Sequence, residues 1–231
     1  MQDKKILVVG CSFLAKLKVD NTKIKVIGIP GAGNTLLAEV VLSELSTKKY
    51  DRVFVIWTGI NRIDLPIGRA LADTFNQQYP YKVFIGNTVW YASGGINMSG
   101  QDYECPKIPS SMFDSFYKSS DQRYLTDQGL GGVLKVQSYL QANQIEHQMA
   151  FIYDIHNDEY DINWLCNVLG KVDTQSHVYQ LIDWDNIQIT NTPYEWAQQC
   201  RQLSDRFHPT DSAMIEWIRE YFQLDIANLQ Q

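Results

Sequence analysis

The stretch Ile6-Leu7-Val8-Val9-Gly10-Cys11-Ser12-Phe13 places a serine just after a short apolar run that ends at a glycine. Four consecutive apolar residues before a glycine are typical of a buried central strand in a parallel sheet. Such sheets bind their ligands beyond the carboxyl ends of the strands. We therefore expect Ser12 to lie where chemistry can take place.

A base for this serine is present near the other end of the chain, in Asp205-Arg206-Phe207-His208-Pro209. A serine hydroxyl is a poor nucleophile at neutral pH unless a base takes its proton and another group orients that base. Asp205 and His208 are three residues apart, so on a single turn the carboxylate can hold one ring nitrogen while the other faces outward. The sequence thus predicts a Ser12–His208–Asp205 triad for acyl transfer.

The rest of the chain predicts one α/β domain over residues 1–231. Apolar or alternating runs predict further strands at Lys23–Ile29, Arg52–Trp57, Lys82–Ile85 and Met149–Tyr153, and a last strand or a loop at 177–182. Apolar residues at helical spacing predict helices at 35–47, 64–79, 121–143 and 160–170, and a final helix capped by Thr210 or Asp211. Strand, glycine turn, helix and strand in this order are typical of a doubly wound parallel sheet.

The segment 86–120 does not fit this pattern. It is rich in glycine, proline, serine and aromatic residues and has no clean period. A stretch of this length without secondary structure is usually functional, disordered or a misread helix. We expect a loop-rich insertion that lies over the site.

Composition excludes several classes of partner. The chain has 231 residues, of which 45% are hydrophobic and 20% charged, and a net charge of −6. It therefore offers no basic face for nucleic acid or for an anionic membrane. No apolar run reaches the length of a signal-peptide core or a membrane span, so we expect a soluble protein, cytoplasmic by default, with a virion or surface assembly as the alternative. No C-x-x-C motif occurs, so the cysteines indicate neither a zinc knuckle nor a redox pair, and we expect no metal.

An acyl-transfer enzyme also needs hydrogen-bond donors aimed at the developing oxyanion. Three such donors are expected at the same edge of the sheet. They are the backbone N–H of Ser12, a glycine N–H in the turn Pro30-Gly31-Ala32-Gly33-Asn34, and the side-chain amide of Asn61.

Four blocks of the sequence, in this order, resemble those of the SGNH (GDSL-like) hydrolases: Gly10-Cys11-Ser12-Phe13, the glycine turn, Gly59-Ile60-Asn61 and Asp205–Pro209. The resemblance spans the chain from end to end. It implies a three-layer α/β/α, flavodoxin-like sheet without a cofactor, the triad named above, and an oxyanion hole formed by Ser12, Gly31 and Asn61. Gly33 is the alternative to Gly31. The chain departs from the family pattern at Cys11 and at Arg62, where aspartate is common.

Three residues are candidates for contact with the substrate. The planar fork of Arg62 suits a carboxylate or phosphate, and the alternative is a solvent-facing salt bridge with Asp64. Trp90 can stack on a sugar ring or pack against the core. His156 lies in a polar stretch after a predicted strand, where a polar turn is the alternative to substrate contact.

The sequence therefore predicts a serine esterase for small acyl esters, with O-acetyl groups on a carbohydrate as the first expectation. The same triad would serve a lipase, a thioesterase or an acyltransferase. A non-catalytic glycan-binding module of a surface or virus-particle assembly is the alternative from another class, because a fold does not by itself determine function. The expected partner is a small-molecule or glycan ester, and the sequence does not indicate an oligomeric state.

Overall fold

The structure is a computed structural model that describes residues 4–17, 19, 22–60, 62, 64–68, 82–85, 88–91, 120–156, 172–204 and 208–224. Its centre is a five-stranded sheet with the order β2-β1-β3-β7-β8, in which every pair of neighbours is parallel. The strands are β1 (Ile6–Gly10), β2 (Ile24–Gly28), β3 (Arg52–Trp57), β7 (Glu146–Phe151) and β8 (Ile187–Gln188). Counted along the chain, this order is 2-1-3-4-5, that of a flavodoxin-like sheet.

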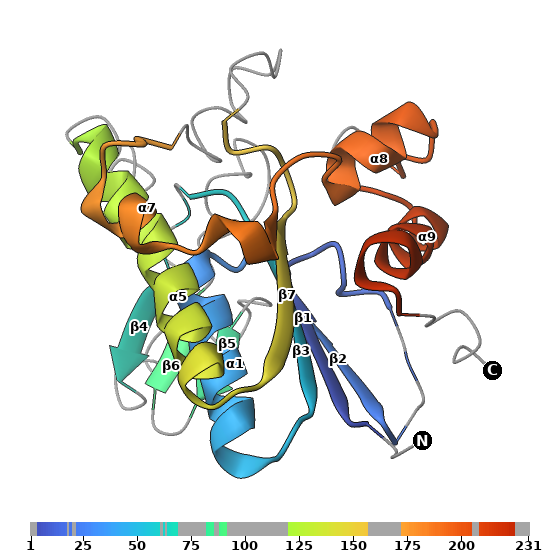
Figure 1. The fold of residues 1–231 in the computed structure, drawn as a ribbon, viewed down its shortest axis with the longest axis horizontal. Coiled ribbons are helices and arrows are strands. Elements are labelled where there is room, and N and C mark those ends of the chain that lie inside the picture. The colour runs from blue at the N-terminus through green and yellow to red at the C-terminus, as the bar shows by residue number, and fades with distance from the viewer. Residues whose placement is uncertain are drawn as a thin grey trace.

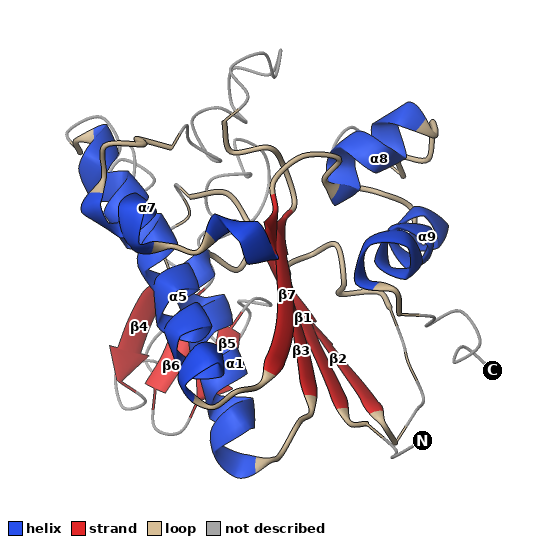
Figure 2. Cartoon of the chain, viewed as in Figure 1, coloured by secondary structure: helices blue, strands red, loops and turns tan. Residues whose placement is uncertain are grey.

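Helices cover both faces of the sheet. On one face lie α1 (Asn34–Thr47), α5 (Gln122–Ala142) and the short α7 (His177–Leu181), and on the other lie α8 (Pro193–Gln199) and α9 (Asp211–Phe222). Figure 1 shows the sheet between these two groups of helices, and Figure 2 shows the same layers by secondary structure. The predicted three-layer α/β/α class is therefore confirmed.

Alternate residues of the central strands divide between two hydrophobic cores. In β1, Leu7 and Val9 pack into the core under α1 and α5, whereas Val8 packs into the core under α9. Because successive side chains of a strand point to opposite faces, an unbroken apolar run is what a strand covered on both faces requires. This requirement explains why the stretch before Ser12 carries no polar residue.

Glycines inside α5 let it pack closely against its neighbours. A Cβ on Gly129 would lie 2.2 Å from the Ile60 carbonyl oxygen, and one on Gly132 would lie 2.5 Å from that of Asn34. Both distances are shorter than any real contact. Gly129 and Gly132 are therefore required by tertiary packing, although glycine is unfavourable inside a helix.

A second, three-stranded antiparallel sheet has the order β4-β6-β5, formed by β4 (Leu65–Gly68), β5 (Lys82–Ile85) and β6 (Thr88–Tyr91). The strand predicted at Lys82–Ile85 is confirmed. The helix predicted at 64–79 is wrong where it can be checked, because 65–68 pairs as a strand with β6. Within the predicted 86–120 insertion, β6 is an unexpected strand. Residues 69–81, 92–119 and the helix predicted at 160–170 lie outside the described residues.

The prediction for residues 177–182 is also corrected. Residues 177–181 form helix α7, not a strand or loop, because the Ser176 hydroxyl accepts the Tyr179 N–H and caps the helix. The last strand is instead β8, which follows a 3₁₀ turn (Trp184–Asn186). The final helix α9 is confirmed, with Thr210 as its cap.

None of the helices within the described ranges is both long and apolar enough to cross a membrane.

Candidate active site

Ser12 lies in the turn that directly follows β1, at the carboxyl edge of the sheet. Backbone hydrogen bonds from Leu14 to the Cys11 carbonyl and from Ala15 to the Ser12 carbonyl close this turn. Cys11 is fully buried, and its sulfur lies 3.9 Å from Ser12 Oγ. Ser12 itself is half-buried. Its hydroxyl therefore lies just beyond the carboxyl end of β1.

His208 reaches Ser12 from a segment 196 positions further along the chain. Its Nε2 lies 3.0 Å from Ser12 Oγ, which is hydrogen-bond distance for a base and its nucleophile. The edge of the Phe13 ring packs against the imidazole at a centroid distance of 5.5 Å. The structure thus brings together the two predicted residues between which the proton would move.

A closed loop holds the backbone of His208. The His208 carbonyl accepts hydrogen bonds from both the N–H and the hydroxyl of Ser204, at 2.8 and 3.0 Å. Leu203 and Pro209 form an antiparallel bridge across the base of this loop. Asp205, the third predicted member of the triad, lies outside the described residues. Ser204 is not among the residues predicted from sequence.

In the glycine turn between β2 and α1, the two candidate glycine donors to the oxyanion differ in their hydrogen bonds. Gly31 has φ of 73°, in the left-handed region that favours glycine. The Gly33 N–H, in contrast, donates to Asp64 Oδ1 at 2.8 Å, and so it is already committed. Among the described residues, no acceptor is found for the Gly31 N–H. Asn61, the predicted side-chain donor, lies outside the described residues.

Asp64 and Arg62 lie under this turn and not at the surface. Asp64 is 6% exposed and accepts a second hydrogen bond, at 2.8 Å, from the Leu36 N–H. Arg62 is 8% exposed and donates from Nη1 to the Ala32 carbonyl at 3.3 Å. The solvent-facing salt bridge considered as an alternative for Arg62 is therefore wrong, because both side chains are buried.

Asn34 links the site to the helices behind it. Its side chain is fully buried, accepts the Thr58 N–H at 2.9 Å and donates to the Gly129 carbonyl at 2.9 Å. These bonds join the end of β3, the start of α1 and the middle of α5. Asn34 was also not predicted as a site residue. No sequence pattern distinguishes it, because its contacts with Thr58 and Gly129 depend on how the strands and helices pack.

The remaining predicted substrate contacts differ in exposure. Trp90 is 9% exposed and packs in the hydrophobic core, which leaves little ring surface for a sugar. His156 is half-buried, and its Nε2 lies 3.0 Å from the Tyr179 hydroxyl. Its backbone N–H donates to Asp154 Oδ1 at 2.8 Å, which makes a polar turn. His156 thus has its own protein partners whether or not it meets a substrate.

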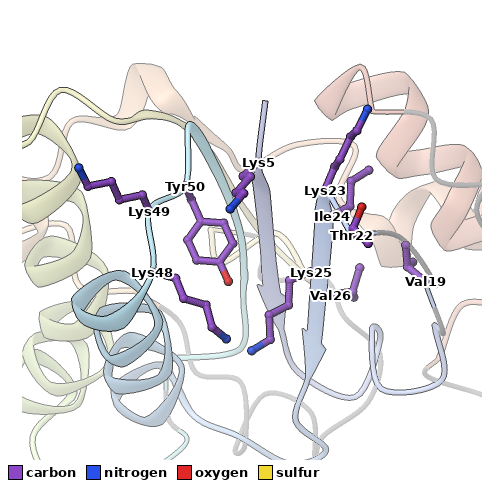
Figure 3. A pocket seen from close by; sticks show the side chains of 10 residues that line it. All are labelled: Lys5, Val19, Thr22, Lys23, Ile24, Lys25, Val26, Lys48, Lys49 and Tyr50. Atoms are coloured by element: carbon purple, nitrogen blue, oxygen red, sulfur yellow. The ribbon is translucent and has the colours of Figure 1, made fainter. Parts of the chain in front are cut away.

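A pocket of about 400 Å³ lies at the opposite, amino edge of the sheet (Figure 3). Five of its ten lining residues are lysines: Lys5, Lys23, Lys25, Lys48 and Lys49. Part of this positive charge is already balanced within the protein. The Glu44 carboxylate accepts hydrogen bonds from Lys25, Tyr50 and Lys48. Neither Ser12 nor His208 lines the pocket, so it is separate from the candidate active site.

No protein-family model matches this chain, and no curated protein matches it in sequence. Among solved structures it is similar to a catalytic mutant of an acetylxylan esterase from Geobacillus stearothermophilus, with 13% identity, a TM-score of 0.44, and coverage of 95% of this chain and 93% of that one. It is also similar to a gut microbial diltiazem-metabolizing enzyme, with 10% identity and a TM-score of 0.43; 95% of this chain and 46% of that one are covered. Likenesses this distant assign no activity.

Proposed function

We propose that this chain is a serine esterase in which Ser12 is the nucleophile and His208 the general base. The observation that carries the proposal is the 3.0 Å distance between Ser12 Oγ and His208 Nε2. Asp205 is the residue we assign to orient the imidazole, since it stands three positions before His208. In this arrangement the carboxylate fixes the histidine tautomer and stabilises the imidazolium that forms during the reaction.

The reaction follows from these roles. Ser12 Oγ attacks the ester carbonyl carbon while its proton passes to His208 Nε2, and the carbonyl oxygen becomes an oxyanion. The N–H groups of Ser12 and Gly31 and the amide of Asn61 are the donors we assign to that oxyanion. The C–O bond then breaks, His208 protonates the leaving alcohol, and water releases the acyl group by the same steps in reverse.

We assign the acyl group as acetyl and the alcohol as a sugar hydroxyl, in line with the resemblance to the SGNH hydrolases. His156 is the substrate contact that we retain, because its ring is half-buried. Trp90 and Arg62 are buried, and we assign them to the support of the fold around the site.

The test is hydrolysis of p-nitrophenyl esters of increasing acyl length, together with an acetylated oligosaccharide. We expect the acetate to be turned over best and Ser12→Ala to abolish turnover and fluorophosphonate labelling. Ser138→Ala, which changes an exposed serine on α5, is the matched control and should retain both. Activity that survives Ser12→Ala would contradict the mechanism. Preference for long acyl chains would favour a lipase, and oligosaccharide binding without turnover would favour a binding module.

A further inference from the structure

We infer that Asp64 is a positioning residue that sets the geometry of the proposed oxyanion hole. The inference rests on the proposed esterase function and adds a role that the predicted triad and oxyanion donors do not contain. Asp64 acts through the glycine turn, and neither its carboxylate nor its backbone is assigned a contact with the substrate.

The first step is that α1 cannot cap its own start. The first N–H groups of a helix have no partner within the helix, and a side chain at the N-cap normally accepts one of them. Here the N-cap residue is Gly33, which has no side chain, and the helix lacks a local side-chain cap. Another part of the chain must therefore supply the acceptor.

Asp64 supplies it from 28 to 31 residues away. Its Oδ1 accepts the N–H of Gly33, the N-cap residue, and its Oδ2 accepts that of Leu36, three positions later, both at 2.8 Å. These are the two N–H groups that a local capping box joins by reciprocal bonds. One buried carboxylate thus replaces the whole capping box, at the end of the helix where negative charge is favoured.

Arg62 binds the carbonyl group of the same turn, whereas Asp64 binds its N–H groups. Its Nη1 donates to the Ala32 carbonyl, so Arg62 and Asp64 together bind the backbone on both sides of the Ala32–Gly33 peptide. The fit is close, since a Cβ on Gly33 would lie 2.7 Å from both the Arg62 carbonyl oxygen and Asp64 Oδ2. Arg62 and Asp64 therefore pack directly against the turn.

This arrangement determines which N–H faces the reaction. The Gly33 N–H is committed to Asp64, which leaves Gly31, with its left-handed backbone, as the glycine donor. Oxyanion donors must be held within roughly 0.5 Å of their working position to stabilise the transition state. Loss of the Asp64 carboxylate should therefore lower the rate of the chemical step and leave substrate binding intact.

The experiment compares Asp64→Asn with Asp51→Asn in the full chain. Asp51 is the matched control because its carboxylate also accepts a backbone N–H from a distant segment, that of Lys5 at 2.7 Å, but at the amino edge of the sheet. With p-nitrophenyl acetate, we expect Asp64→Asn to lower kcat about 10- to 100-fold with little change in KM, since one lost oxyanion donor costs about 10²–10³-fold. Asp51→Asn should leave both constants unchanged.

A transition-state analogue separates positioning from simple loss of folded protein. Phenylboronic acid forms a tetrahedral adduct with an active serine, and its inhibition constant should rise for Asp64→Asn in proportion to the fall in kcat/KM. Partial unfolding would lower kcat but leave the inhibition constant of the surviving enzyme unchanged. An unchanged inhibition constant would overturn the inference.

The unaltered protein provides a second measurement if Asp64→Asn does not fold. On addition of phenylboronic acid, the amide resonance of Gly31 should shift strongly in an NMR spectrum, whereas that of Gly33 should stay where it is. A shift at Gly33 alone would overturn the inference. Failure of the esterase proposal is distinguishable, because then Ser12→Ala would leave any activity unchanged and phenylboronic acid would shift neither glycine.

Discussion

The two edges of the central sheet place polar residues in different ways. They are separated by the length of β1, roughly 16 Å for five extended residues. At the carboxyl edge, polar groups from distant segments converge: the half-buried His208 on the half-buried Ser12, and the buried Asp64 on the glycine turn. At the amino edge, five lysines line the pocket in Figure 3 and remain largely in solvent. Two of them, Lys25 and Lys48, pair with Glu44.

The difference shows where this fold can build a reactive centre. Buried hydrogen bonds to charged groups fix geometry and are costly to disturb, whereas exposed ion pairs contribute little and adapt freely. In a parallel sheet all carboxyl ends lie at one edge, so the turns that leave β1, β2 and β3 meet there. The amino edge has charge, but the pairs described there, Lys25 and Lys48 with Glu44, lie on the surface and include no serine or cysteine.

The largest difference between the two edges is expected when a histidine is removed from each of them in turn. We expect His208→Ala to lower kcat about 10⁴-fold, because the serine loses its base. The double variant with Ser12→Ala should be no slower than Ser12→Ala alone, since the two residues act as a unit. His147→Ala, in the amino half of β7, is the control and should stay within about threefold of the unaltered protein in p-nitrophenyl acetate turnover. Equal losses for both histidines would contradict the comparison.

A glycine pair tests how tightly the carboxyl edge is packed. A Cβ on Gly28, at the end of β2, would lie 2.2 Å from the Ala15 nitrogen and would push on the turn that follows Ser12. We expect Gly28→Ala to lower the free energy of unfolding by about 1–3 kcal/mol and to reduce kcat. Gly131→Ala in α5, where a Cβ meets nothing within 4 Å, should stabilise by up to about 1 kcal/mol. Urea unfolding measures both, and a tolerated Gly28→Ala would contradict the close packing.

Phe13 offers a smaller effect at the same edge. Its ring packs edge-on against His208 and against Tyr153, at 5.5 and 5.9 Å. Aromatic pairs of this kind contribute about 0.5–1.5 kcal/mol, so Phe13→Leu should lower kcat by about 2- to 10-fold through a less ordered imidazole. Phe54→Leu, which loses a stacked contact with Phe222 in the core, should cost stability but not kcat per folded molecule. Equal kcat in both variants would show that Phe13 does not order His208.

The smallest effect belongs to the amino edge. Burial opposes ionisation of Glu44, but the hydrogen bonds from Lys25, Tyr50 and Lys48 outweigh it and lower its pKa. A lowered folded-state pKa gives stability that is present above the unfolded value, roughly 4.3, and is lost as the pH falls through the folded value. Glu44→Gln should therefore cost about 0.3–1 kcal/mol at pH 7 and less at pH 3, by urea unfolding. If the stability difference between the unaltered protein and Glu44→Gln grew as the pH fell, the predicted direction would be wrong.

Much of the fold could be predicted because its strongest signals are local. The apolar run before Ser12 and the β-branched run at Arg52–Trp57 specify buried strands on their own. Where the signal was weak or misleading, tertiary structure decided. The β-prone residues at 177–181 became a helix under the Ser176 cap, and β8 is too short, at two residues, to leave a pattern.

The candidate site divides in the same way. The residue types of Ser12 and His208, and their places after a strand and before a helix, could be inferred from the sequence. The supporting contacts of Asn34, Asp64 and Ser204 could not, because each depends on which backbone groups packing leaves without a partner.

By itself, the sequence determined the chemistry available to this protein: a serine at a strand end, a histidine with an aspartate three residues before it, and glycines that permit a tight turn. Only the tertiary structure decided that Ser12 and His208 meet, and that the Gly33 N–H donates to Asp64. Within the described ranges, the Gly31 N–H has no such acceptor. The physical reason is the separation along the chain over which each interaction acts. Propensity and periodicity act over a few residues, whereas these hydrogen bonds join segments whose distance is set by the packing of the whole domain.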